Sequence, residues 1–353
     1  MMKIDMYAHF CPKKFIDYFS KHIVSWEKLP KGFQTVAMPM MWDVDRRLEV
    51  MDRYEDYVQV LFPSGLTAVT FCSPKDAASL AQVYNDAMAE IVSKYPDKFV
   101  GAIAYLPINN IDAALKEIDR AINELDFKGI ALNTPMYERK KPFEPGDEIT
   151  KPIDSPELMP IYESMSKHKL PIWIHPSGTG GVPAYHGEER GKYGLFHVFG
   201  WPLESAMAMG RLVCSGILTR YPNLRFIIHH CGSAIVPALA GRLDNHFDYL
   251  SRVEGMKWGQ PGGEDPFEVK RPVDYFRMFY ADTALYGDSA GLMCGYDFFG
   301  VEHILFGTDY PWDIEGGDKY IRLTINAVNR MNISDADKEK IFEGNAKQIM
   351  RLE

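Results

Sequence analysis

The sequence predicts a closed (β/α)8 barrel, an α/β fold with eight parallel strands inside a ring of helices. Short apolar runs alternate with amphipathic segments along the whole chain, which is the pattern of parallel strands joined by crossover helices. The runs number eight, the strand count at which such a sheet closes into a barrel. We expect the strands at 3–9, 58–64, 99–106, 127–133, 170–176, 224–230, 276–282 and 303–308. No internal repeat or linker divides the chain, so we expect one domain, 1–353.

Several segments between these runs carry signals for the start of a helix. Asp43 precedes a segment with helical spacing of apolar residues, and Ser73 is followed by Pro74, which suits the first position of a helix. Residues 110–125 carry a clear apolar stripe with helical spacing. Further helices are expected from Ser155, over 202–220, over 233–249, and from Ser334 to Met350.

Four connections are longer than a minimal barrel needs. They cover 10–42, 134–155, 177–200 and 251–275. Loops at the carboxyl ends of barrel strands usually form the substrate pocket. We therefore expect loop insertions at the C-terminal face of the barrel.

Composition excludes several classes of protein. The net charge of -9 argues against nucleic acid as a partner, because such binding needs a cationic surface. No run approaches the roughly 18 apolar residues of a membrane span, and the first residues lack the apolar core of a signal peptide. We expect a cytoplasmic protein without a membrane segment. The 5 cysteines are widely spaced and predict neither a disulfide framework nor a structural zinc knuckle.

Three predicted strands end on residues that can bind a metal ion. His9 and His175 end the first and fifth strands, and Asp309 follows the eighth. Taken alone, each histidine is explained by hydrogen bonds to local backbone, and the aspartate by a capping role. Because the carboxyl ends of barrel strands meet at one face, the three together favour a divalent metal such as zinc, with a position left for water or substrate.

Two further strand ends need a choice of orientation. Tyr7 lies two residues before His9, so both side chains leave the same face of the strand. His229 and His230 are adjacent, so only one of them is expected to face the barrel interior. Gly232 lets the backbone turn just after His230, so we expect His230 to be the inward, titrating residue.

The chain carries several longer motifs. They are DRRLEVMD at 45–52, PIWIHP at 171–176, PLESA at 202–206, RLVCSGI at 211–217, YPNLR at 221–225, HCG at 230–232 and GTDYP at 307–311. In these motifs the chain resembles, nearly end to end, the amidohydrolase-2 branch of the amidohydrolase superfamily. That group contains aminocarboxymuconate-semialdehyde decarboxylase and the hydroxybenzoate decarboxylases.

The resemblance implies roles for individual residues. His9, His175 and Asp309 match metal ligands, His230 matches an acid/base beside the metal, and Asp309 also matches a group that handles the proton given to carbon. In the semialdehyde decarboxylase, arginines bind a substrate carboxylate. Arg46 or Arg47 matches one of these arginines, and Arg242 matches another, which would reach in from a second subunit of a homodimer. The aromatic residues expected near the loops, among them Trp201, have side chains that can stack on a planar substrate.

The sequence departs from the family pattern in two places. Family members carry His-x-His or Glu-x-His on the first strand, whereas this chain carries Tyr7-Ala8-His9. Tyr7 is then a rare ligand, a residue next to the ligands, or the mark of a site that has lost its metal. The segment after His230 is also one residue longer than in the family.

Three functions follow from these residues. The first is a metal-dependent nonoxidative decarboxylase, a carboxy-lyase that acts on an aromatic or muconate-type carboxylic acid, with Tyr7, His230 and Asp309 as catalytic residues. The alternative is a metal-assisted hydrolase or hydratase acting on a carbon–carbon bond, lactone or alkene. A non-enzymatic barrel is the third, and the retained histidines and Asp309 argue against it. Zinc is the expected metal, with manganese as the alternative.

Overall fold

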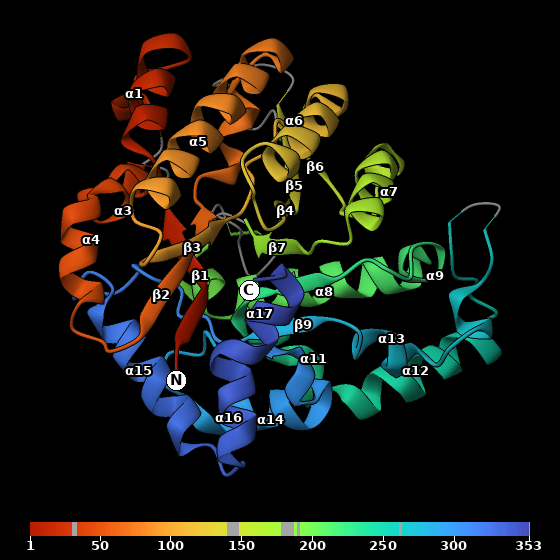
Figure 1. The fold of residues 1–353 in the computed structure, drawn as a ribbon. Coiled ribbons are helices and arrows are strands. Elements are labelled where there is room, and N and C mark those ends of the chain that lie inside the picture. Colours follow the sequence, from red (N-terminus) through yellow and green to blue (C-terminus); the bar gives the residue numbers. More distant parts are fainter. Residues whose placement is uncertain (30–33, 140–147, 178–186, 189–190, 261–262, 353) are drawn as a thin grey trace.

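The eight expected strands form a closed parallel barrel (Figure 1). The computed structural model describes residues 1–29, 34–139, 148–177, 187–188, 191–260 and 263–352. The barrel strands are β1 (Lys3–Phe10), β2 (Tyr57–Pro63), β3 (Phe99–Ala102), β4 (Ile130–Thr134), β7 (Ile172–Pro176), β8 (Phe226–Ile228), β9 (Tyr280–Asp282) and β10 (Ile304–Leu305). The predicted (β/α)8 fold is therefore confirmed. The prediction of a single domain stays a prediction.

Two short bridges close the barrel. The strands form one sheet in the order β1-β2-β3 and another in the order β10-β9-β8-β7-β4. A parallel bridge between Ala104 and Ile130 joins β3 to β4, and one between Ala8 and Tyr310 joins the first strand to the last. Next to the second bridge the Asp309 amide donates to the Tyr7 carbonyl at 3.0 Å. This seam places the end of β1 beside Asp309.

Bulky side chains fill the barrel interior. One cluster of side chains includes Met6, Tyr7, Phe62, Trp173 and Leu305, each of which is at most 1% exposed. A larger layer of apolar side chains, between the strands and the helices, surrounds this cluster. The indole of Trp173 donates to the Met6 carbonyl at 3.3 Å across the barrel. The interior is thus a packed core, which leaves chemistry to the strand ends and loops.

The helix starts predicted at Asp43 and Ser73, and the helix predicted from residue 110, are confirmed by their caps. Asp43 accepts from the Arg46 amide at the start of α4 (Val44–Met51), and Ser73 accepts from the Asp76 amide at the start of α5 (Pro74–Lys94). Asn110 caps α6 (Ile111–Asn123) in the same way. A short side chain that accepts from the third residue ahead satisfies an amide that the helix leaves unpaired. The later helices are α7 (Met159–His168), α13 (Pro272–Phe276), α14 (Ser289–Phe299), α15 (Asp318–Arg330), α16 (Asp335–Glu339) and α17 (Asn345–Met350).

Some expected elements differ in the structure. The helix expected over 202–220 is broken into α8 (Trp201–Cys214) and α9 (Ile217–Arg220), because Gly216 has a left-handed φ of 76°. The segment 233–249 forms α11 (Ile235–Ala238) and α12 (Ala240–Arg252). The long first connection, treated as a loop, contains the helices α1 (Lys13–His22) and α3 (Pro39–Trp42), and the connection after β4 contains a hairpin of β5 (Met136–Arg139) and β6 (Glu148–Lys151).

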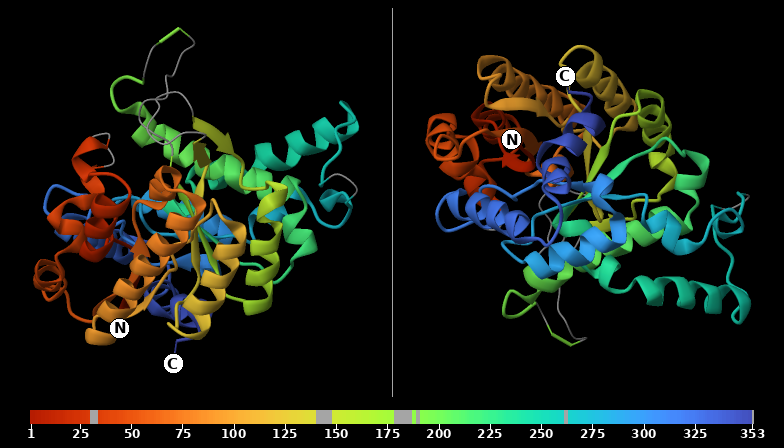
Figure 2. Two further views of the ribbon diagram at one scale, coloured as in Figure 1. Left: turned by 90° about the horizontal axis from the view of Figure 1, so that it is seen from above. Right: turned by 60° about the horizontal axis from the view of Figure 1, so that its bottom comes forward.

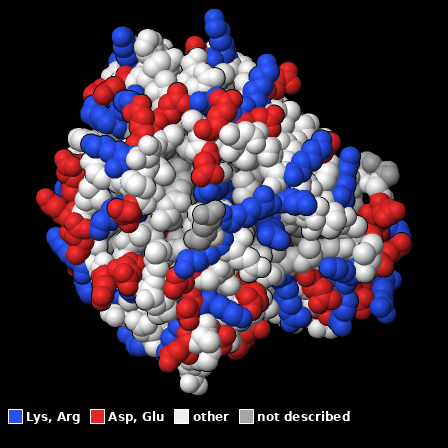
Figure 3. Space-filling view, in the orientation of Figure 1, with Lys and Arg blue, Asp and Glu red and all other residues white. Residues whose placement is uncertain are grey.

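The helix α12 extends away from the barrel (Figure 2). None of its side chains is buried. On the face seen in Figure 3, acidic and basic side chains are interspersed. Within the described ranges, no helix has both the length and the apolar character needed to span a bilayer.

Candidate functional site

His9 and Asp309 meet at the seam between the first and last strands. The His9 ring is held by Ser64, whose hydroxyl lies 2.9 Å from Nδ1. The opposite nitrogen, Nε2, lies 3.2 Å from Oδ1 of Asp309. Both of these atoms are buried, and neither has a hydrogen-bond partner among the residues that the structure describes. An imidazole nitrogen and a carboxylate oxygen that approach each other in this way fit two ligands of one cation.

His175, the third predicted ligand, lies beside this pair. Its ring centroid is 5.1 Å from that of His9 and 5.9 Å from that of Tyr7. Burial and the neighbouring histidines hold the pKa of His175 well below its usual range. The imidazole is therefore neutral, which is the form that binds a metal ion.

The donor types fit a divalent metal, but the side chains do not form a ready three-donor cage. Among the described residues, no group of three or more His, Cys, Asp or Glu side chains is arranged so that it could hold a metal ion. The structure therefore brings His9 and Asp309 into ligand-like proximity and places His175 nearby.

The second oxygen of Asp309 faces two other groups. The Tyr286 hydroxyl donates to Oδ2 at 2.7 Å, and Nε2 of His230 lies 3.9 Å from the same oxygen. Burial favours a raised pKa for Asp309, but His230 and His9 outweigh it and hold the pKa of this carboxyl well below its usual range. Burial lowers the pKa of His230, and the Asp309 carboxylate outweighs burial, so the pKa of His230 is raised. Each shift therefore favours the charged form of its group, the carboxylate of Asp309 and the imidazolium of His230.

Both adjacent histidines face the barrel, which corrects the expectation that only one would do so. The strand β8 ends at Ile228, and His230 and Cys231 have left-handed φ values of 60° and 54°. This turn frees the two imidazoles from the alternation of a strand. His230 points toward Asp309, as expected, while His229 packs with its ring centroid 4.9 Å from that of Phe62.

His229 is fixed by a buried carboxylate that the sequence analysis missed. Its Nδ1 lies 2.8 Å from Oδ2 of Asp282, while its Nε2 is buried and has no hydrogen-bond partner in the described part of the chain. Oδ1 of Asp282 accepts from the amides of Cys231 and Ala284, both at 3.0 Å. Burial raises the pKa of Asp282 to about 6. Asp282 is the last residue of a predicted strand, so the reasoning applied to the other strand ends would have found it.

Tyr7 lies between the ligand candidates and His229. Its side chain is 1% exposed, and its ring stacks on the imidazole of His229. Burial and the Asp309 carboxylate raise the pKa of Tyr7 well above its usual value. Tyr7 is therefore a neutral phenol in this arrangement, not a phenolate.

The three predicted arginines have different surroundings. Arg47 is completely buried: Nη1 donates to Gln59 at 2.9 Å, Nη2 donates to the carbonyl of His9, and the guanidinium lies over the rings of Phe10 and Tyr310. Arg46, the next residue along α4, is exposed. Arg242 is exposed on α12. Only Arg46 and Arg242 therefore have guanidinium groups open to an anion.

Two indoles border the histidines. Trp201, at the start of α8, lies nearly parallel to the His230 ring, with 6.5 Å between centroids. Trp312, after β10, lies edge-on to His9 at 5.8 Å. These rings give the site flat apolar walls.

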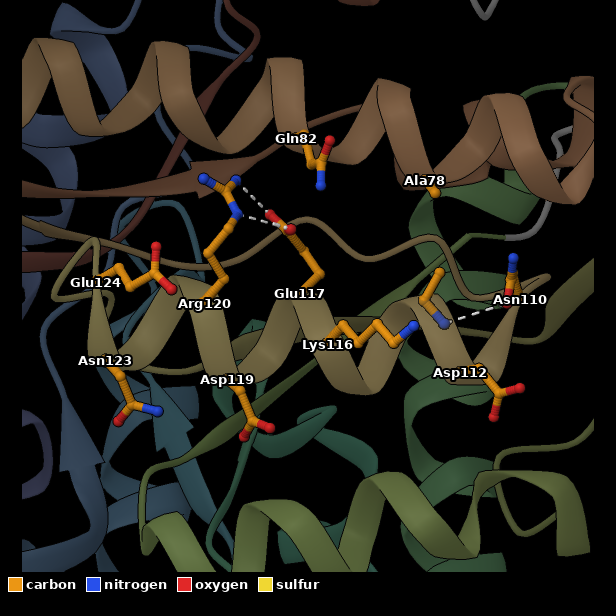
Figure 4. A pocket seen from close by; sticks show the side chains of 11 residues that line it. Ala78, Gln82, Asn110, Asp112, Lys116, Glu117, Asp119, Arg120, Asn123 and Glu124 are labelled. Carbon is orange, nitrogen blue, oxygen red and sulfur yellow. Dashed lines mark hydrogen bonds and ion pairs between the residues drawn. The ribbon is translucent and has the colours of Figure 1, made fainter.

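A cavity of about 770 Å³ lies elsewhere, between α5 and α6 on the outside of the barrel (Figure 4). Its most buried charge, Glu117, is already paired with Arg120 at 2.7 Å and with Asn85 at 2.6 Å. The most buried charge of this cavity is therefore already paired, and the strand-end cluster remains the candidate site.

Comparison with known proteins gives one family over nearly the whole chain. The family described as amidohydrolase matches residues 4–352. The chain is 26% identical to 2-amino-3-carboxymuconate-6-semialdehyde decarboxylase of Dictyostelium discoideum, over 100% of this chain and 92% of that protein. It is 27% identical to gamma-resorcylate decarboxylase of Rhizobium radiobacter, over 88% of this chain and 87% of that protein. It is 28% identical to 2-keto-4-carboxy-3-hexenedioate hydratase of a Sphingobium strain, over 77% of this chain and 72% of that protein.

Solved structures share the fold. The 5-carboxyvanillate decarboxylase of Sphingomonas paucimobilis superposes with a TM-score of 0.80 at 20% identity, covering 100% of this chain and 99% of that one. The dihydroxybenzoic acid decarboxylase of Polaromonas was crystallised with manganese and 2-nitroresorcinol. It superposes with a TM-score of 0.73 at 23% identity, covering 99% of this chain and 97% of that one.

Proposed function

Because the chain belongs to the amidohydrolase family, we propose that it is a metal-dependent nonoxidative decarboxylase of an aromatic or muconate-type carboxylic acid. The observation that carries the proposal is the position of Asp309 between His9 and His230, with one oxygen toward each imidazole. The decarboxylases among its relatives, which align over most of both chains, support the same reaction.

His9, His175 and Asp309 would hold the divalent ion. A bound divalent ion supplies a Lewis acid that fixes and polarises a substrate oxygen. Zinc suits two imidazoles and a carboxylate, and manganese is the ion in the Polaromonas structure, so both belong in the test.

His230 would supply the proton. Burial lowers the pKa of His230, but the Asp309 carboxylate raises it overall and so favours the protonated imidazole, whose ring lies nearly parallel to that of Trp201. Transfer of this proton to the substrate carbon that bears the carboxylate makes that carbon tetrahedral. The bond to the carboxylate then breaks, its electron pair restores the conjugated system, and carbon dioxide leaves. Asp309, ionised and beside His230, stabilises the imidazolium before transfer.

Exposed cationic and aromatic groups would bind the rest of the substrate. Trp201 offers a face for stacking, and Arg46 offers a guanidinium for a second anionic group. The protruding α12 would carry Arg242 toward the site of a second subunit in a homodimer. We place the enzyme in the cytoplasm.

The test is an assay of carbon dioxide release from a panel of hydroxybenzoates and muconate-type acids, with protein loaded with zinc or manganese. Release from at least one acid is expected, and the H230N variant should lose it. Inactivity of fully loaded protein across the panel would overturn the proposal.

The hydratase among the relatives supports one alternative, the addition of water to an alkene. Oxygen-18 from labelled water would then appear in the organic product. In decarboxylation the organic product gains only a proton.

A further inference from the structure

Tyr286 is a residue of the site that neither the sequence analysis nor the proposed mechanism uses. It lies in the connection between β9 and α14, with 41% of its surface exposed. Its hydroxyl donates to Oδ2 of Asp309 at 2.7 Å. A hydrogen bond of this length to a carboxylate is charge-assisted and strongly directional.

The two oxygens of Asp309 have different surroundings. Oδ1 approaches Nε2 of His9 without a hydrogen bond, and both atoms are buried. Oδ2 is bound by Tyr286, while Nε2 of His230 lies 3.9 Å away, beyond hydrogen-bond distance. If Tyr286 did not occupy Oδ2, rotation of the carboxylate would bring this oxygen toward His230 and turn Oδ1 away from His9.

The backbone holds Tyr286 in this position at a cost. Its φ is 50°, in the left-handed region that a bulky side chain rarely adopts, and its partner Asp309 and the nearby His230 share this feature, with φ values of 64° and 60°. Such conformations cluster where surrounding contacts fix a functional geometry. The ring of Tyr286 packs on that of Tyr320, with centroids 4.4 Å apart, which steadies it from the side.

We propose that Tyr286 is a positioning residue for Asp309. Its hydroxyl binds Oδ2, so that Oδ1 is presented to the metal and His230 is left free. The inference rests on the proposed metal-dependent function. It gives Tyr286 the place of a residue next to the predicted ligands.

The experiment compares manganese affinity in three proteins: wild type, Y286F and Y320F. Each is stripped of metal with a chelator and then titrated with Mn2+ alone. Y286F removes only the oxygen that binds Asp309, whereas Y320F removes a hydroxyl from the stacked neighbour, which makes no hydrogen bond to Asp309 within the described residues. We expect about 10- to 100-fold weaker binding in Y286F, as for other groups that orient a metal ligand, and a change of less than about 2-fold in Y320F.

A second readout separates positioning from a general structural role. At limiting Mn2+ the decarboxylase activity of Y286F should fall, and saturating Mn2+ should restore most of it, with an unchanged melting temperature. Equal affinity in Y286F and wild type, equal losses in Y286F and Y320F, or failure of Y286F to fold would each overturn the inference. Wild-type protein that binds neither manganese nor zinc would overturn the proposed function together with it, so the two failures are distinguishable.

Discussion

The imidazole of His229 lies against the phenol ring of Tyr7, with ring centroids 3.5 Å apart and planes inclined by 19°. Because Asp282 fixes His229 from the other side, the position of Tyr7 is set by packing and by a buried hydrogen bond. Tyr7 therefore keeps its place without a metal–phenolate bond, which favours a role beside the ligands.

The first prediction separates Tyr7 from His9. H9A should abolish binding of zinc or manganese, because it removes one atom of the pair that approaches at 3.2 Å. Y7F should retain a full equivalent of metal and turn over more slowly, since the ring and its stacking remain. Elemental analysis of both variants is the measurement. Loss of metal in Y7F would show that the phenol is a ligand.

The second prediction concerns the proton donor. H230N should lower kcat by about 10²- to 10⁴-fold, the usual contribution of a general acid, with metal content unchanged. The matched variant H229N should instead lower the melting temperature, because it disturbs the pair with Asp282. The assignment would be reversed if H229N lost the chemistry and H230N kept it.

The third prediction concerns Asp282. D282A should lower the free energy of unfolding by about 3 kcal/mol or more, because it leaves His229 and the amides of Cys231 and Ala284 without their buried acceptor, at about 1–3 kcal/mol each. Urea unfolding measures this loss. D274N, at an aspartate whose side chain is 50% exposed, serves as the surface control and should change stability by less than about 0.5 kcal/mol.

The fourth prediction contrasts two neighbouring arginines. R47M should destabilise the protein by about 2–4 kcal/mol, because Gln59 and the His9 carbonyl lose a buried charged donor. R46M should leave stability nearly unchanged and raise KM for an acid with a second carboxylate. Denaturant unfolding and steady-state kinetics on both variants provide the check. A rise in KM confined to R47M would mean that the buried guanidinium leaves its place when substrate binds.

The fifth prediction follows from His175, whose pKa in the folded protein is lowered. Below about pH 6.5, His175 binds a proton in the unfolded chain but stays neutral in the folded chain. The free energy of unfolding therefore falls as the pH falls, by at most about 1.4 kcal/mol per pH unit. In chelator-treated protein, H175Q should reduce the slope of the free energy of unfolding against pH, between pH 5 and 6.5, by up to this amount. H246Q, at an exposed position on α12, should retain the wild-type slope. Parallel curves for H175Q and wild type would contradict the assignment.

The strand ends could be predicted from sequence, because an apolar run followed by His or Asp places a polar group at the barrel face. This reasoning found His9, His175, His230 and Asp309, and applied to the seventh strand it would have found Asp282. The left-handed turn at His230, which brings both histidines inward, leaves no mark on the apolar pattern. Tyr286 could not be predicted, because its contact with Asp309 depends on the path of a loop.

The amphipathic pattern predicted the helices that begin with a capping side chain better than the others. The start of α5 after Ser73 and both ends of α6, expected over 110–125, agree with the structure within a few residues. The break at Gly216 and the helix α1 were not predicted, because packing against the barrel decides both.

The seam between the first and last strands has a consequence for biosynthesis. Asp5, near the start of the chain, accepts from the amide of Thr308 at 3.0 Å, across 303 positions of sequence. Since His9 and Asp309 meet on this seam, a growing chain cannot bring the two side chains together until its last strand has left the ribosome. A chain cut before residue 300 should therefore carry His9 and His175 without the carboxylate beside which His9 lies in the closed barrel.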